Sequence, residues 1–134
     1  MFLSKTKMEP TYKVIICGDR NWYDSELEMA MEQLLVQMPR NVLIIHGACK
    51  GVDMTADKIA RKLGFNVLPM PANWKAYGKA AGPIRNKEML DVAVNGMNVV
   101  NAVYAFHKDI ENSKGTKDMT NQAMKRGVPV KILI

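Results

Sequence analysis

The chain has no apolar run approaching the roughly 20 residues needed to cross a bilayer. Its 134 residues suffice for one domain with a hydrophobic core and are too few for two domains of ordinary size. The first ten residues, MFLSKTKMEP, have too little apolar length for a secretion signal. We therefore expect a cytoplasmic protein, with a flexible leader at 1–12 and one domain at 13–134.

Cysteine and histidine are also scarce, with two residues of each type. Cys17 and Cys49 end apolar runs, and without a secretion signal their expected state is a buried, reduced pair. His46 and His107 lie far apart in the sequence, and neither has a partner at the spacing of metal ligands. We expect no metal site.

Two common nucleotide-binding motifs are missing. The stretch HGACKG at 46–51 is not a Walker A loop, which requires Gly-Lys-Ser/Thr at fixed spacing. No G-x-G-x-x-G fingerprint is followed by an acidic residue about 20 positions later. Conventional ATP or NAD binding therefore has no direct support, and we expect no bound cofactor.

The balance of charge is basic, with a net charge of +6 and a pI near 9.4. The Lys and Arg residues are scattered rather than gathered in blocks. Such a balance is compatible with nucleic-acid binding, with a small phosphorylated ligand, or with solubility alone. Net charge by itself does not decide between these functions.

From Lys13 onward, apolar segments rich in β-branched residues alternate with amphipathic segments, and turn signals separate them. The predicted strands are 13–18, 41–47, 65–70, 99–106 and 128–134. The predicted helices run from an N-cap at Ser25 to Pro39, from Val52 to Leu63, from Pro83 to about Val94, and from Thr116 to Arg126. Apolar strands linked by helices indicate a parallel sheet covered on both faces. We predict an α/β, Rossmann-like single domain with a mainly parallel five-stranded sheet.

The unusual residues of the chain follow these predicted strands. Open parallel sheets bind ligands at the carboxyl ends of their strands, where the topology switches. The loops concerned are Gly18-Asp19-Arg20, 46–51, 74–85 and Gly115-Thr116. Each could be an ordinary turn or cap when taken alone. Together, at one edge of the sheet, they predict a ligand site.

The segment 74–89, WKAYGKAAGPIRNKEM, is typical of an anion-binding loop. Gly78 and Gly82 let main chain approach a ligand closely, and Pro83 is suited to the first turn of a helix. Arg85 would lie one turn inside that helix. Because helix N-termini present unpaired N–H groups and partial positive charge, we predict that Arg85 contacts a ligand phosphate.

Four segments have the order and spacing found in the SLOG superfamily: GDRNW (18–22), HGACKGVD (46–53), WKAYGKAAGPIRNKEM (74–89) and KGTKDM (114–119). The chain resembles the small YspA-like branch of that superfamily over 13–134. The resemblance implies a Rossmann-like domain that binds nucleotides or nucleotide-derived ligands. Relatives include the Lonely Guy enzymes, which cleave the N-glycosidic bond of cytokinin nucleoside monophosphates, the DNA-processing protein DprA, and sensors of NAD-derived signals.

The resemblance also places individual residues. Arg85 stands where the Lonely Guy enzymes have the arginine of an Arg-Lys motif, with Asn86 in place of the lysine. Gly115 and Thr116 match the Gly-Thr of their Pro-Gly-Gly-x-Gly-Thr-x-x-Glu motif. The Pro-Gly-Gly is replaced by the polar stretch 107–114, and Met119 stands where the catalytic glutamate would be. A thioether cannot act as a general acid or base.

The predicted ligand-binding residues come from all four loops. Trp22, Trp74 and Tyr77 are included because an aromatic ring beside such loops could stack on a base. The full set is Gly18, Asp19, Arg20, Trp22, His46, Gly47, Lys50, Gly51, Asp53, Trp74, Tyr77, Gly78, Lys79, Gly82, Arg85, Asn86, Gly115, Thr116 and Asp118. The sequence assigns none of them a catalytic role.

The favoured function is binding or sensing of a nucleotide or nucleotide-derived small molecule without turnover, since the glutamate is absent. The alternative is phosphoribohydrolase-like cleavage of an N-glycosidic bond, for which Asp53 or Asp19 would have to supply the carboxylate. Asp53 could equally lie in the first turn of a helix for its dipole. A lesser alternative is DprA-like nucleic-acid binding. The identity of the ligand stays open.

A homodimer or higher homo-oligomer is also expected. This expectation rests on the resemblance and on the predicted helix from Ile84 to Val94, whose apolar residues occupy more than one face. A helix buried between a sheet and a partner would have this pattern.

Overall fold

The computed structural model describes residues 9–134 and contains a five-stranded sheet in which every neighbouring pair is parallel. Its strands are β1 (Tyr12–Gly18), β2 (Val42–His46), β3 (Asn66–Pro69), β4 (Ala102–Phe106) and β5 (Val130–Leu133). The helices are α1 (Ser25–Val36), α2 (Val52–Lys62), α3 (Trp74–Tyr77), α4 (Ala81–Asp91) and α5 (Gly115–Lys125), with two 3₁₀ turns, η2 (Gly78–Ala80) and η3 (Ile110–Asn112). The predicted Rossmann-like fold is confirmed.

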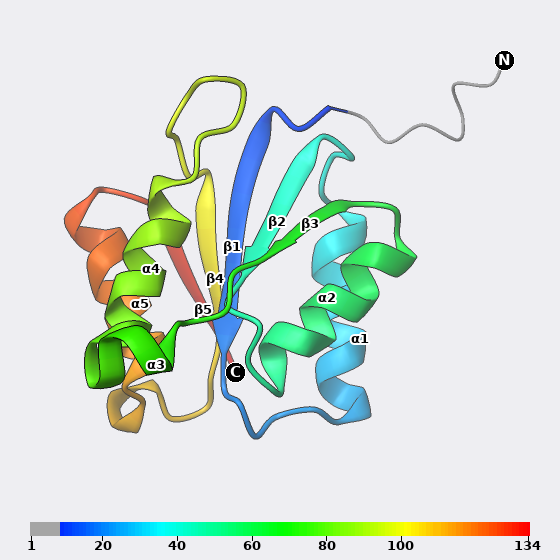
Figure 1. Cartoon of the computed structure of the whole chain (residues 1–134). Coiled ribbons are helices and arrows are strands. Elements are labelled where there is room, and N and C mark those ends of the chain that lie inside the picture. Colours follow the sequence, from blue (N-terminus) through cyan, green and yellow to red (C-terminus); the bar gives the residue numbers. More distant parts are fainter. Residues whose placement is uncertain (1–8) are drawn as a thin grey trace, which may run out of the picture.

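The spatial order of the strands is β3-β2-β1-β4-β5. The chain builds outward from β1 through β2 to β3, then returns to the other side of β1 for β4 and β5. The switch point therefore lies between β1 and β4, whose carboxyl ends point downward in Figure 1. Loops that leave neighbouring strands in opposite directions open a crevice there. The fold places its natural ligand site at this edge.

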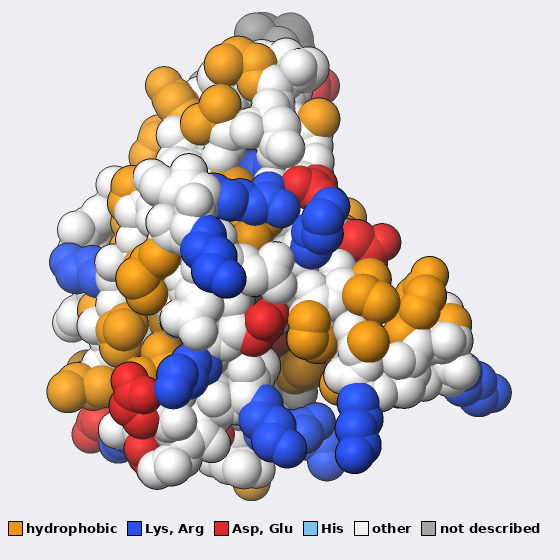
Figure 2. All heavy atoms as spheres, turned by 90° about the vertical axis from the view of Figure 1, so that its left-hand side faces the viewer, with side chains coloured by type: hydrophobic (Ala, Val, Ile, Leu, Met, Phe, Trp, Pro, Cys, Tyr) orange, Lys and Arg blue, Asp and Glu red, His pale blue; other side chains and the backbone are white. Residues whose placement is uncertain are grey.

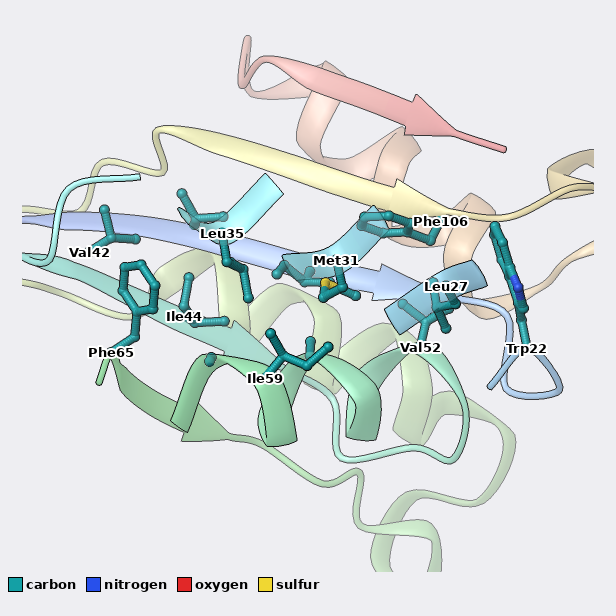
Figure 3. Close-up of a cluster of buried hydrophobic side chains, with 14 residues drawn as sticks. Trp22, Leu27, Met31, Leu35, Val42, Ile44, Val52, Ile59, Phe65 and Phe106 are labelled. Carbon is teal, nitrogen blue, oxygen red and sulfur yellow. The ribbon is translucent and has the colours of Figure 1, made fainter. Parts of the chain in front are cut away.

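The side chains of β1 point alternately to the two faces of the sheet, where the core forms two layers. Val14 and Ile16 face α1 and α2, whereas Ile15 and Cys17 face α4 and α5. Successive side chains of a strand point to opposite faces, so a central strand must be apolar at every position. Figure 1 shows the two helix layers on either side of the sheet, and Figure 3 shows the first layer, from Val42 to Trp22. Each fully buried aliphatic side chain contributes about 1.5–3 kcal/mol through removal from water.

Several element boundaries differ from the predicted ones because side chains of the preceding loops act as caps. Asp24, not Ser25, caps α1, since its Oδ1 accepts the N–H of Leu27 at 2.9 Å. At α5 the predicted cap Thr116 lies inside the helix, and Ser113 Oγ accepts the N–H groups of Thr116 and Lys117 at 3.1 and 3.3 Å. Short polar side chains that satisfy free N–H groups fix these helix starts.

The predicted helix from Pro83 to Val94 is shifted. α4 begins at Ala81, two residues earlier, and ends at Asp91, after which Val92 is extended. The segment 74–80 forms α3 and η2 where a loop was predicted. Val94 is buried in the connection to β4 rather than on a helix. The apolar excess behind the expected oligomer is therefore not on one helix, and the oligomer stays a prediction.

Residues 1–8 of the predicted leader (1–12) lie outside the described part of the chain. β1 begins at Tyr12, inside the predicted leader. Among the described residues, no helix combines the length and the apolar character needed to cross a membrane.

A buried lysine closes the end of α4. The Lys13 side chain has no exposed surface, and its Nζ donates to the carbonyl oxygens of Leu90 (3.1 Å) and Val92 and to Oδ1 of Asn98 (3.0 Å). Burial lowers the pKa of Lys13. An ammonium group at a helix C-terminus satisfies carbonyls that have no intrahelical partner and complements the dipole. Lys13 thereby ties β1 to α4 and to the connection that follows it.

Replacing this lysine should cost much more stability than replacing an exposed one. We expect Lys13→Met to lower the free energy of unfolding by about 2–4 kcal/mol, because buried carbonyls lose their donor at about 1–3 kcal/mol each. Urea denaturation of both variants measures the difference. The exposed Lys125 on α5 is the control, and Lys125→Met should change stability by no more than about 0.5 kcal/mol. Equal losses in the two variants would contradict the role given to Lys13.

Candidate functional site

A cavity of about 570 Å³ opens at the carboxyl edge of the sheet, at the switch point. Its walls come from the segments that follow β1, β2, β3 and β4 and from α4 and α5. Its volume falls within the range of about 300–1,000 Å³ typical of small-molecule sites. The predicted residues that line it are Gly18, Asp19, Arg20, Gly47, Asp53, Trp74, Gly82, Arg85, Asn86, Gly115 and Thr116. All four predicted loops contribute to this list.

Other predicted residues do not line the cavity: Trp22, His46, Lys50, Gly51, Tyr77, Gly78, Lys79 and Asp118. Trp22 is 8% exposed, packs edge-to-face on Phe106 with 6.4 Å between ring centroids, and donates through Nε1 to Asp24. It belongs to the core, so stacking of Trp22 on a base is not supported. Trp74, in contrast, is 57% exposed at the cavity wall. Lys50, Tyr77 and Lys79 are exposed beside the wall segments.

Sequence reasoning missed several lining residues. These are Cys17, Asn21, Cys49, Met89, His107, Asp109, Asn112, Ser113 and Lys114. Most are neighbours of predicted residues in the same loops. The last five belong to the polar stretch 107–114, which stands in place of the Pro-Gly-Gly of the Lonely Guy motif. That replacement was the feature of the sequence from which they could have been predicted. Cys17 is buried at the cavity floor, and burial and the nearby Asp53 raise the pKa of its thiol. Cys49 is half-buried, so the expected buried pair holds for Cys17 alone.

Three glycines of the loops are required by packing. A Cβ at Gly18 would lie 2.3 Å from the carbonyl oxygen of Phe106, and one at Gly51 would lie 2.3 Å from that of Asp19. A Cβ at Gly47 would lie 2.5 Å from Nη1 of Arg85. Gly51 also has a φ of +74°, which side chains with a Cβ rarely adopt. The space beside these glycines is filled by the protein itself.

The turn after β2 is held between two buried charged side chains. Asp53, 5% exposed, accepts through Oδ2 the N–H groups of Gly47 (3.1 Å) and Cys49 (3.2 Å). Arg85, 8% exposed, donates through Nη1 to the carbonyl oxygens of Gly47 (2.7 Å) and Met70 (3.3 Å). Burial raises the pKa of Asp53, although these N–H donors and the nearby Arg85 oppose the rise. The cavity thus contains a carboxyl group whose ionised form is disfavoured.

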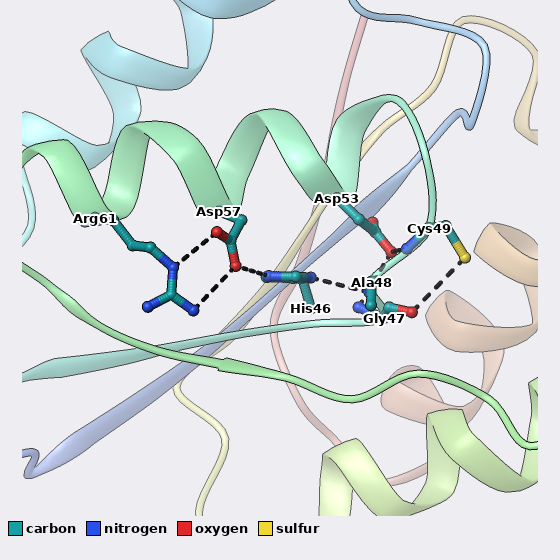
Figure 4. A network of polar contacts seen from close by, with 7 residues as sticks. All are labelled: His46, Gly47, Ala48, Cys49, Asp53, Asp57 and Arg61. Atoms are coloured by element: carbon teal, nitrogen blue, oxygen red, sulfur yellow. Dashed lines mark hydrogen bonds and ion pairs between the residues drawn. The ribbon is translucent and has the colours of Figure 1, made fainter.

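A second layer orients the same turn from behind (Figure 4). His46 is fully buried, its Nδ1 accepts the N–H of Ala48 at 3.0 Å, and its Nε2 lies 2.7 Å from Oδ2 of Asp57. Because Nδ1 accepts, Nε2 must carry the proton and donate to Asp57. Arg61 then donates to Asp57 at 2.8 Å. This chain supports Ala48, whose φ is +58°. His46 is therefore a positioning residue that does not face the cavity.

On the opposite wall, hydrogen bonds join the N-terminal turns of α4 and α5. Asn86 accepts from Nε of Arg85 at 3.0 Å and donates to the carbonyl oxygen of Gly115 (3.2 Å) and to Asp118 (3.0 Å). Gln122 donates to the same oxygen of Asp118 at 2.7 Å. Asp118 is thus engaged with two amides. Asn86, which the resemblance matches to the lysine of the Lonely Guy Arg-Lys motif, links Arg85 to the first turn of α5.

Met119 faces away from the cavity. It is 1% exposed and packs in the core layer between the sheet and α4 and α5. The position matched to the Lonely Guy glutamate is therefore a core position in this chain. Among the described residues, no group of three His, Cys, Asp or Glu side chains is placed to share a metal ion.

Asp53 and Asp57 should affect stability in opposite directions. Burial raises the pKa of Asp53 above the unfolded value of about 3.9. Its charge therefore destabilises the fold at neutral pH, and this cost disappears as pH falls through the folded pKa. Because an amide oxygen can still accept from Gly47 and Cys49, Asp53→Asn should unfold at an equal or higher temperature than the parent at pH 7. The difference should narrow toward pH 4.

Asp57 provides the matched comparison. Its hydrogen bonds with Arg61 and His46 hold its pKa below the usual value. The ionised form therefore stabilises the fold above the unfolded pKa, and the effect is lost as pH falls through the lower folded pKa. Asp57→Asn should lose about 1–3 kcal/mol at pH 7, as expected for hydrogen bonds to a charged group. Thermal unfolding between pH 3 and pH 7 measures both variants, and a destabilised Asp53→Asn at pH 7 would contradict the assignment.

Comparisons with known proteins agree with the resemblance seen in the loops. The model of the YspA, cpYpsA-related SLOG family matches residues 12–77. The gene 61 protein of Mycobacterium phage D29 is 34% identical over 124 residues, which cover 88% of this chain and 93% of that protein. The match to the phage protein therefore spans nearly the whole domain, including the loops after β3 and β4.

Two solved structures share the fold. DNA processing protein A (DprA) from Streptococcus pneumoniae has a TM-score of 0.69 at 17% identity, over 90% of this chain and 50% of that one. The Moco Carrier Protein from Chlamydomonas reinhardtii has a TM-score of 0.60 at 18% identity, over 94% of this chain and 76% of that one. The chain thus spans half the length of the DprA chain. Given the matched family model and the phage relative, this chain belongs to the YspA, cpYpsA-related SLOG family.

Proposed function

We propose that the cavity binds a nucleotide or nucleotide-derived small molecule and that the protein is a binding or sensing module. One observation carries the proposal. At the switch point, a buried arginine and the first turn of α5 face the same cavity, and an exposed tryptophan stands at its wall. Phosphate, sugar and base are the three groups that such an arrangement can contact. Membership of the SLOG family supports the same class of ligand.

Arg85 is oriented for a phosphate before any ligand arrives. Its Nη1 and Nε are engaged with Gly47, Met70 and Asn86. Nη2 makes none of these bonds, and no described buried side-chain nitrogen lacks a partner. Nη2 therefore opens to the cavity, which the Arg85 side chain lines. A guanidinium already fixed on two sides loses little conformational entropy on binding, and its bond to a phosphate is charge-assisted.

The first turn of α5 supplies the neighbouring contacts. Ser113 Oγ accepts two N–H groups of this turn, so the hydroxyl proton of Ser113 remains to donate to a ligand. Gly115 and Thr116 line the cavity beside it, and a Cβ at Gly115 would meet open space. The positive end of the helix dipole adds to the attraction of an anion. Trp74, which also lines the cavity, offers its ring to a base.

Substitution of Arg85 tests the site. Arg85→Lys keeps the charge but loses the planar fork, so it should weaken binding of the tightest nucleotide in a panel by about 1.5–3 kcal/mol. The panel contains nucleoside monophosphates, ADP-ribose and NAD-derived cyclic nucleotides, ranked by thermal stabilisation and measured by calorimetry. Arg126→Lys, on an exposed arginine paired with Asp91, is the control. Affinities equal to the parent's in both variants would refute the assignment.

A phosphoribohydrolase-like activity is the second candidate, and Asp53 is the observation in its favour. It is a cavity carboxyl group whose pKa burial raises, as a general acid at neutral pH requires. Against it, the position matched to the catalytic glutamate of the Lonely Guy enzymes is occupied by the buried Met119. Oδ2 of Asp53 is moreover committed to two backbone N–H groups. A structural carboxylate accounts for these contacts.

Turnover separates the two functions. We expect no free base and no ribose phosphate when the parent protein is incubated with the same panel and the products are separated by chromatography. Asp53→Asn, which should fold, is the matched variant. Steady base release by the parent that disappears in Asp53→Asn would overturn the binding-module proposal in favour of the hydrolase.

A further inference from the structure

We propose that two copies of this chain associate through the β5 edge, defined as the outer side of residues 130–134, so that the sheet continues from one copy into the other. Among the described residues, the strand order ends at β5, which has a neighbouring strand on one side alone. An edge strand of this kind presents N–H and C=O groups that can pair with another chain. No residue of this edge lines the cavity, so the association leaves the proposed ligand site open.

The hydrogen bonds to β4 show which backbone groups of β5 are turned outward. The N–H of Val103 donates to the carbonyl oxygen of Pro129 at 2.9 Å. The N–H of His107 donates to that of Leu133 at 3.0 Å. Since alternate residues of a strand direct their backbone groups to opposite sides, the residues between these acceptors in alternation point away from β4. The outward residues are Val130, Ile132 and Ile134.

The opposite edge of the sheet is protected against pairing. The N–H of Met70 donates to the carbonyl oxygen of His46 at 2.8 Å, so the alternate residues of β3 that point outward are Val67 and Pro69. Proline has no N–H to donate, and proline on an edge strand is one of the ways in which proteins prevent pairing between chains. The outward positions of the β5 edge hold no proline. The β5 edge is therefore the one that is open to a further strand.

A second copy fits the β5 edge through a two-fold axis at Ile132. Such an axis, perpendicular to the sheet, makes the two edges antiparallel. Ile132 then exchanges both backbone hydrogen bonds with Ile132 of the second copy, and Val130 does so with Ile134. Lys131 lies opposite Leu133, whereas a register centred on Lys131 would place two lysines opposite each other and be destabilising. Charge thus selects the register in which every outward backbone group of 130–134 gains a partner.

The side chains at this edge favour the same association. The outward residues share the face of the sheet that α4 and α5 cover, yet Ile132 is 46% exposed and Ile134 is 84% exposed. On α5, Gln122 bonds to α4 and Ala123 packs in the core layer. Since successive helical residues are rotated by about 100°, the exposed Met124 lies on the flank away from α4, on the β5 side.

Pairing would bring these exposed apolar side chains of the two copies together and remove part of their surface from water. Figure 2 shows the side of the molecule on which α4 and α5 lie, and hydrophobic side chains gather along the left of that view. The edge therefore offers both the backbone groups and the apolar contacts that a second copy needs.

Proline at Ile132 tests the edge without breaking the sheet. Because the N–H of Ile132 points away from β4, Ile132→Pro removes a donor from the interface and none from the pairing with β4. Light scattering and sedimentation of the parent over a range of concentrations should show a dimer. Ile132→Pro should raise its dissociation constant about tenfold or more, because two hydrogen bonds are lost, one from each copy.

Val67→Pro, at an outward position of the β3 edge, is the matched control and should leave the dimer unchanged. A parent that stays monomeric at every concentration would overturn the inference, as would an Ile132→Pro variant that dimerises as tightly as the parent. A dimer that Val67→Pro dissociates and Ile132→Pro leaves intact would move the interface to β3 and overturn it too.

Cysteine cross-linking tests the register and does not require the proline variant to fold. In the proposed register the Cα atoms of the two Ile132 residues lie about 5.5 Å apart, within the range of about 4.4–6.8 Å that a disulfide spans. The two Lys131 residues are diagonal neighbours at about 7–8 Å, beyond that range. Ile132→Cys should therefore form a disulfide-linked dimer under mild oxidation, and Lys131→Cys should not. The parent, with Cys17 and Cys49, gives the background. Equal cross-linking of the two variants, or none above the background, would contradict the proposed pairing.

Discussion

The turn between β2 and α2 is the constraint on which the site depends. Its backbone must pass between Asp53 and Arg85, with Gly47 donating to one side chain and accepting from the other. A buried charge without partners is costly, so each of the two groups relies on the backbone amides that it binds. If the turn moved, both Asp53 and Arg85 would lose hydrogen-bond partners. Arg85 is fixed as a consequence, and the wall of the cavity is fixed with it.

The fixed position of this turn depends on further contacts with neighbouring elements. His46 and Asp57 hold the far side of the turn, and Asn86 links the arginine to the first turn of α5. These contacts rest on elements that pack through two separate core layers, one on each face of the sheet. The sheet separates the two layers, and successive side chains of each strand point into one layer and then the other. Loops from both halves of the sheet are therefore brought to one edge with little freedom.

Much of this arrangement could be predicted because it follows from patterns that are local in sequence. Continuous apolar strands and intervening helices specified the parallel sheet, and the parallel sheet specified the edge. The direction of each side chain could not be predicted, since it depends on packing across the domain. Trp22 lies in a motif loop yet turns into the core, and Met119 occupies a motif position that the sheet buries. The role of Asp57 could not be predicted from the sequence either, because its partner His46 is eleven residues away on another element.

The segment formed by α3 and η2 contributes almost nothing to the interior, since none of its residues is buried. Substitutions there change the mouth of the cavity without changing the packing that stabilises the domain. Natural selection can therefore vary the aromatic and basic residues of this segment at little cost in folding. Among relatives with the same sheet and the same buried arginine, divergence of ligand preference would concentrate in these seven residues.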